Sequence, residues 1–179
     1  MKTSILIILS LLIGNTINMQ KIYGQSDRIL EQINFFSTYE ITERLDELKL
    51  YQYNNKIKVD KAKALADDLE KLKQKCVVGF VYTSRLINKL NYYDKKEFLP
   101  DVVEIKSLYR SIHDNLKDIQ SFAKKMSKNP NKYRKKTLAY LNRKIKTAKI
   151  IQKKLQEKSH ILSKIYEWEK QYADSNFAN

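Results

Sequence analysis

Apolar residues recur at helical spacing through the first half of the chain. Across residues 41–90, steps of alternately four and three residues predict the a/d seam of a long helix or helical hairpin arm, with an interruption at 52–55. The composition of residues 76–83 would also suit a strand, but no other segment offers a partner strand, so helix is favoured. The seam positions are Ile41, Leu45, Leu48, Gln52, Asn55, Val59, Ala62, Ala66, Leu69, Lys73, Cys76, Phe80, Thr83, Ile87 and Leu90.

The same spacing predicts a second helix after a connection at residues 91–99. Pro100 suits the first position of that helix, where its missing N–H costs nothing. The seam then continues without a polar position through Val102, Ile105, Tyr109, Ile112, Leu116, Ile119, Ala123 and Met126.

Asn129 and Pro130 repeat the start signal, an N-cap candidate followed by proline, and also end the preceding helix. They predict a last helix over residues 131–172, followed by a frayed tail at 173–179. A short helix over 27–37, carrying Leu30, Ile33 and Phe36, is expected to pack across one end. The last helix carries on one side Leu138, Leu141, Ile145, Ala148, Leu155, Leu162 and Tyr166.

Long helices with such seams are stable only when they pack against one another. The predicted fold is therefore all-α, an elongated antiparallel bundle of three long helices plus the short N-terminal helix. Composition agrees, because the chain has only three glycines and two prolines, whereas sandwiches, barrels and dinucleotide-binding folds need many glycine turns. Charged residues at 31% and hydrophobic residues at 42% exclude both a disordered chain and a membrane bundle.

Residues 1–24 have the layout of a secretory signal peptide. Lys2 precedes an apolar run over residues 5–13, and a small residue, Gly24, stands before Gln25. The run is about half of the roughly 20 residues that a membrane-spanning helix needs, so an uncleaved anchor is the less favoured alternative. Cleavage would leave one helical-bundle domain over residues 25–179, located in the periplasm or secreted.

Cys76 is the only cysteine and cannot form an internal disulfide. After export it would be available for an intermolecular bridge or as a reactive thiol. Because it falls in register with the apolar seam, a small buried side chain is the favoured interpretation.

Positive charge is concentrated in one segment. The net charge is +15, and residues 124–164 contain fifteen basic residues against one acid, Glu157. A face built only for solubility usually mixes signs and gains i,i+4 pairs, so an anion-facing surface and a simple solvated face remain as alternatives. The candidate binding residues are Lys132, Lys135, Lys136, Arg143, Lys146, Lys149 and Lys153.

Several anionic partners are compatible with this surface. Nucleic acid would use the positive charge, with Tyr133 and Tyr140 available to stack on bases, but export disfavours it outside a DNA-transfer machine. Phospholipid or lipopolysaccharide headgroups, or an acidic partner subunit, suit the predicted location better. An oligomer is also possible.

The sequence predicts no catalytic, cofactor or metal site. Glu157 and His160 have the spacing of a di-iron helix motif, but the second such pair is missing. His113 and Asp114 are neighbours in sequence and are expected to point to different sides of their helix. No nucleophile elbow or phosphate loop occurs.

In overall build, a leader over residues 1–25 followed by long helices over 26–172, the chain resembles the secreted helical subunits of type IV secretion and conjugation systems. It also resembles, more loosely, the basic periplasmic chaperones of the Skp class, but it lacks the strands of that family's trimeric body. The first resemblance implies a non-enzymatic envelope protein that acts by protein contact in a conjugation or secretion apparatus. A periplasmic holdase and an anionic membrane-surface binder are the alternatives.

Overall fold

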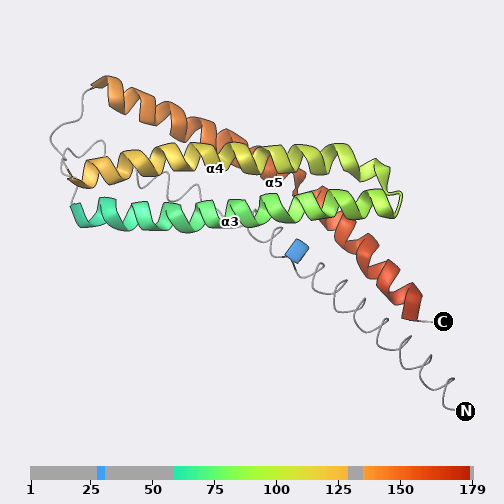
Figure 1. The fold of residues 1–179 in the computed structure, drawn as a ribbon. Coiled ribbons are helices and arrows are strands. Elements are labelled where there is room, and N and C mark those ends of the chain that lie inside the picture. The colour runs from blue at the N-terminus through green and yellow to red at the C-terminus, as the bar shows by residue number, and fades with distance from the viewer. Residues whose placement is uncertain (1–27, 31–58, 129–134, 178–179) are drawn as a thin grey trace, which may run out of the picture. The chain divides into compact units, whose positions relative to one another are not determined.

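A computed structural model describes residues 28–30, 59–128 and 135–177. These residues form α3 (Val59–Tyr92), the short 3-10 helix η1 (Lys96–Phe98), α4 (Leu99–Lys128) and α5 (Lys135–Phe177) (Figure 1). No strand occurs among them, which confirms the all-α prediction. The predicted leader, the 41–58 part of the first seam with its interruption, and Asn129 and Pro130 lie outside the described residues.

Helix α4 buries the face that the sequence predicts. All eight seam positions from Val102 to Met126 are buried, and Gln120 and Phe122 are buried beside them. The helix begins at Leu99, so Pro100 is its second residue and still lies within the first turn, where no N–H is required. The apolar spacing of this segment is therefore sufficient to define its core face.

Helix α3 buries a different row from the predicted one. Ala66, Leu69, Cys76, Thr83 and Leu90 are buried as expected, whereas Lys73, Phe80 and Ile87 are only half-buried. The positions immediately before these three are the buried ones, namely Leu72, Gly79 and Leu86. From Leu69 the seam steps by three and then four residues, rather than by four and then three, so three of the eight predicted positions from Ala66 to Leu90 were wrong by one residue.

The α3–α4 connection closes without glycine. Asp94 adopts a φ of 53°, the left-handed conformation that short polar side chains tolerate better than most. The Lys95 N–H donates to the carbonyl of Leu90 at 2.8 Å, and the Asp94 N–H donates to that of Asn91 at 3.3 Å. These two bonds form a Schellman motif, which satisfies the last carbonyls of α3 and reverses the chain.

Helices α3 and α4 lie side by side and run antiparallel (Figure 1). Two contacts fix their register. Near the start of α3, Gln120 donates to the carbonyl of Ala66 at 2.9 Å, and in the middle, Gly79 lies against the ring of Tyr109. Only glycine allows this second approach, because a Cβ at position 79 would lie 2.8 Å from Tyr109 Cδ1 and closer still to the two neighbouring ring atoms.

Helix α5 is longer than the sequence predicts. It continues to Phe177, past the expected end at Tyr172, and Ala173 is buried, so the segment expected to fray is helical over 173–177. The predicted positions Leu141, Ile145, Ala148, Leu155 and Leu162 are buried and Tyr166 is half-buried. Ion pairs from Asp118 to Lys144 and from Asp101 to Lys158 show that this part of α5 runs antiparallel to α4.

The chain divides into two compact units, Phe36–Ser159 and Met1–Phe35 with His160–Asn179. The first contains α3, α4 and the part of α5 up to Ser159. In the second, residues 28–30 are helical with Ile29 fully buried, whereas Leu30, predicted as an inward position, is 36% exposed. Ile33 and Phe36 lie outside the described residues.

Cys76 is completely buried in α3, as the favoured interpretation predicted. Burial raises the pKa of its thiol to about 12, because the thiolate would lose its hydration. The thiolate is the reactive form, so the environment of Cys76 suppresses its chemistry.

We expect Cys76 of the native protein to resist thiol–disulfide exchange. At pH 8 the thiolate fraction of a group with a pKa of about 12 is about one in ten thousand. Ellman's reagent should therefore react slowly under native conditions and at the ordinary rate in concentrated urea. Rapid stoichiometric labelling of the folded protein would show that Cys76 is accessible.

Candidate functional site

The predicted basic residues of α5 differ in their surroundings. Arg143, Lys146 and Lys153 are exposed, and Lys149 is half-buried. Lys132 and the side chains of Lys135 and Lys136 lie outside the described residues. The structure thus places three of the seven predicted residues on one exposed stretch of helix.

Two other lysines of α5 are paired with carboxylates of α4. Lys144 Nζ lies 2.7 Å from Asp118 Oδ2, and Lys158 Nζ lies 2.6 Å from Asp101 Oδ1 and 2.7 Å from Glu104 Oε2. Residues 124–164 contain almost no acids, but α4 supplies carboxylates to one side of α5. Because the acids come from another helix, counting charges along the segment overestimated the free positive charge.

These cross-helix pairs also shift the pKa values of their members. The hydrogen bond from Lys144 lowers the pKa of Asp118 and raises the pKa of Lys144 itself. Hydrogen bonds to Asp101 and Glu104 raise the pKa of Lys158 in the same way. All these groups are partly solvated, so the pairs orient α5 on α4 more than they stabilise it.

The side of α5 opposite its buried row retains four exposed cations, which we call the outward basic face: Arg143, Lys146, Lys153 and Lys154. Within the described part of the chain, no carboxylate pairs with Arg143, Lys146 or Lys154. Lys153 Nζ lies 3.9 Å from Glu157 Oε1, but both side chains are more than half exposed, and such a pair contributes little. Three of its four residues belong to the predicted surface, Lys154 is added by the structure, and the face remains available to an anionic partner.

Tyr140, which the sequence offered for base stacking, is held near one of the cross-helix pairs. Its hydroxyl donates to Asp118 Oδ2 at 3.4 Å, and Lys144 Nζ lies 5.6 Å from its ring centroid. Tyr133 lies outside the described residues. Tyr140 therefore contributes to the α4–α5 contact rather than to the outward basic face.

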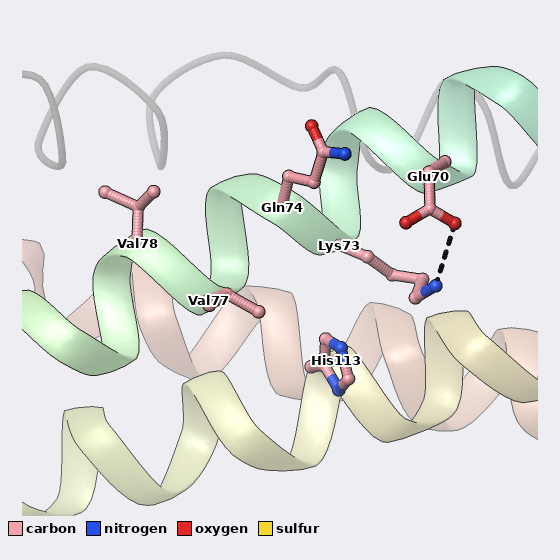
Figure 2. A pocket seen from close by; sticks show the side chains of 6 residues that line it. All are labelled: Glu70, Lys73, Gln74, Val77, Val78 and His113. Atoms are coloured by element: carbon pink, nitrogen blue, oxygen red, sulfur yellow. Dashed lines mark hydrogen bonds and ion pairs between the residues drawn. The ribbon is translucent and has the colours of Figure 1, made fainter.

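A second surface feature is a shallow groove between α3 and α4, with a volume of about 290 Å³ (Figure 2). Val77 and His113 line both this groove and an adjoining one of about 300 Å³. In Figure 2, Val78 points away from α4, and both valines are about half exposed. The groove is lined by Glu70, Lys73, Gln74, Val77, Val78 and His113.

A polar network closes one end of this groove. The Gln120 amide donates to Glu70 Oε2 at 2.7 Å, and Lys73 Nζ donates to Gln120 Oε1 at 3.0 Å and to Glu70 Oε2 at 2.9 Å (Figure 2 shows the last). The hydrogen bond from Gln120, followed by that from Lys73, lowers the pKa of Glu70. The network satisfies the buried Gln120 amide and links α3 to α4, so it has a structural role.

The histidines show no arrangement suited to metal binding. His113 Nδ1 lies 3.2 Å from Asp114 Oδ1, so the expectation that these neighbours diverge was wrong. Among residues 28–30, 59–128 and 135–177, no group of three or more His, Cys, Asp or Glu side chains could hold a metal ion.

Fold and surface together define an all-α helical-bundle protein with an exposed cationic helix face. No helix in the described part of the chain combines the length and the apolar character needed to cross a membrane. No family model, curated protein or solved structure matches this chain.

Proposed function

We propose that the protein is an exported, non-enzymatic helical-bundle component of the cell envelope that acts by contact with other macromolecules, as part of a conjugation or secretion apparatus. The contact uses the outward basic face of α5 and an anionic partner surface. A periplasmic holdase and an anionic membrane-surface binder are the alternatives for the same chain.

One observation carries the proposal. After the lysines that pair with α4 are set aside, Arg143, Lys146 and Lys154 remain exposed, with no carboxylate partner among the described residues. Glu157 is the one acid among residues 124–164, so the exposed cations repel one another with little compensation, and the face is better suited to an anionic partner than to solubility. Export is supported by the layout of residues 1–24, and the apparatus by the resemblance in overall build.

Neutralising the face should abolish function without unfolding the protein. We expect the triple variant Arg143→Gln, Lys146→Gln, Lys154→Gln to weaken partner binding at least about tenfold and to fail in complementing a deletion strain in a conjugation or secretion assay. Its thermal midpoint should stay close to that of wild type, because all three side chains are exposed.

The matched control removes the same charge elsewhere. Lys63, Arg85 and Lys117 are exposed on α3 and α4, and their replacement by glutamine also removes one arginine and two lysines. This variant should complement normally. If both triple variants fail, net charge rather than this face matters, and if both behave like wild type, the face is only a solvated surface.

Two probes test the holdase alternative and a DNA-transfer role. A holdase should keep an unfolded outer-membrane protein from aggregating, and a DNA-transfer role should give single-stranded DNA binding that weakens steeply with salt, because exposed charges are screened within about 10 Å at 0.1 M. Failure with both probes at low salt removes these two alternatives.

Export has its own test. Mass spectrometry of the protein from its native host should find an N-terminus near Gln25, since Gly24 precedes the expected cleavage point. A cytoplasmic product that keeps Met1 would contradict the proposed location.

A further inference from the structure

An exposed isoleucine, Ile150, lies on the side of α5 opposite its buried row. Ile150 follows Leu141 by nine residues, which is two and a half helical turns, so it lies on the side opposite that buried leucine. Its side chain is 51% exposed, whereas the next residue, Ile151, is 8% exposed. An apolar side chain thus projects from the outward basic face, whose one nearby acid, Glu157, lies 3.9 Å from Lys153 Nζ.

The outward basic face surrounds Ile150. Lys146 and Lys153 are four residues before it and three after it, Lys154 is four after it, and Arg143 stands two turns earlier on the same side. At a rise of 1.5 Å per residue the four cations span about 16 Å along the helix. Since lysine and arginine have long flexible stems, all four charges can reach one common plane level with or behind the isoleucine.

An apolar side chain outermost, with cations level with it or behind it, matches the layering of a lipid–water interface. Apolar groups enter the acyl boundary there, while cations remain at the level of the phosphates. An acidic protein would need a pocket for Ile150 with carboxylates placed around it, whereas a bilayer accommodates both features without specific shape. A convex helix ridge that presents its one apolar side chain foremost is therefore better suited to a membrane than to a pocket.

We propose that Ile150 and the outward basic face bind the surface of an anionic phospholipid bilayer, with Ile150 entering the acyl boundary and the four cations contacting the phosphates. This inference rests on the part of the proposed function that assigns the outward basic face to an anionic surface, and it takes that surface to be a membrane rather than a protein.

The test uses the mature chain from Gln25 to Asn179 in flotation with vesicles. Binding is expected to equimolar phosphatidylglycerol and phosphatidylcholine, not to phosphatidylcholine alone, and is expected to fall as salt is added. Each cation near the surface contributes about fivefold to affinity, so the triple variant Arg143→Gln, Lys146→Gln, Lys154→Gln should bind about a hundredfold more weakly. The control at Lys63, Arg85 and Lys117 should retain most of the binding.

Ile150 gives the result that charge alone does not predict. Ile150→Ser should weaken binding to the anionic vesicles about tenfold with an unchanged salt dependence, and Ile150→Leu should bind like wild type. Both substitutions are at an exposed position, and circular dichroism should show an unchanged helix content and melting curve. If Ile150→Ser binds like wild type, no apolar insertion occurs and the proposal is wrong.

The outcomes also separate this inference from the proposed function. If wild type does not bind anionic vesicles at low salt, but the triple variant still fails to complement while its control succeeds, the face has an acidic protein partner. The membrane proposal is then overturned and the proposed function stands. If vesicles are not bound and the triple variant complements, both proposals are overturned.

Discussion

Ile112→Asp is expected to destabilise the bundle by about 3 to 5 kcal/mol, a large part of the roughly 5 to 15 kcal/mol that stabilises a typical domain. Ile112 has no exposed surface and lies in the middle of the buried row of α4. A carboxylate there would lose its hydration without gaining a partner. Urea unfolding followed by far-ultraviolet circular dichroism should show a lower midpoint, or a chain that is already unfolded in buffer.

Two further variants make that result specific to burial. Ser107→Asp places the same carboxylate at an exposed position of α4 and should change stability by less than about 0.5 kcal/mol. Ile112→Val removes one buried methylene and should cost about 0.5 to 1.5 kcal/mol. An unchanged midpoint for Ile112→Asp would mean that the face of α4 is wrongly assigned.

Gly79→Ala is expected to lower stability by about 1 to 2 kcal/mol, although alanine favours a helix over glycine by about 1 kcal/mol. The new Cβ would overlap the ring of Tyr109, which is fully buried. Overpacking of this kind costs more than the gain in helix propensity. Equilibrium unfolding of the single variant measures the difference.

The opposing ring provides the control for Gly79. In a Tyr109→Leu background the overlap is removed, so adding Gly79→Ala should be neutral or stabilising, and the cycle should give a coupling of more than about 1 kcal/mol. Val78→Ala, at a half-exposed neighbouring position, should change stability by less than about 0.5 kcal/mol. Stabilisation by Gly79→Ala alone would show that the two helices are farther apart at this level.

The seam of α3 shows the limit of a repeating pattern. Seams that step by three and then four residues, or by four and then three, have the same mean spacing. In this segment both seams pass through apolar residues. Leu72 and Leu86 are more apolar than Lys73, and that difference was the available signal for the correct phase. Gly79 carried no side chain to indicate burial, so its position against Tyr109 needed the packing of two helices.

The candidate site was predicted only in part. The exposed positions of Arg143, Lys146 and Lys153 agree with the sequence-based surface, and Lys149 is less exposed than a binding residue should be. Ile150 was missed, although its spacing from Leu141 was sufficient to place it outward.

The sequence by itself determined that the chain forms long helices. It also determined which side of α4 faces inward. Apolar periodicity and the scarcity of glycine and proline act through neighbours within a few residues, so they can be read along the chain. The tertiary structure decided which cations remain exposed, because Lys144 and Lys158 are paired with Asp118, Asp101 and Glu104 of α4, more than twenty residues away in sequence. Coulombic pairing depends on distance in space, and the distance between charges on two helices is fixed only when the helices pack.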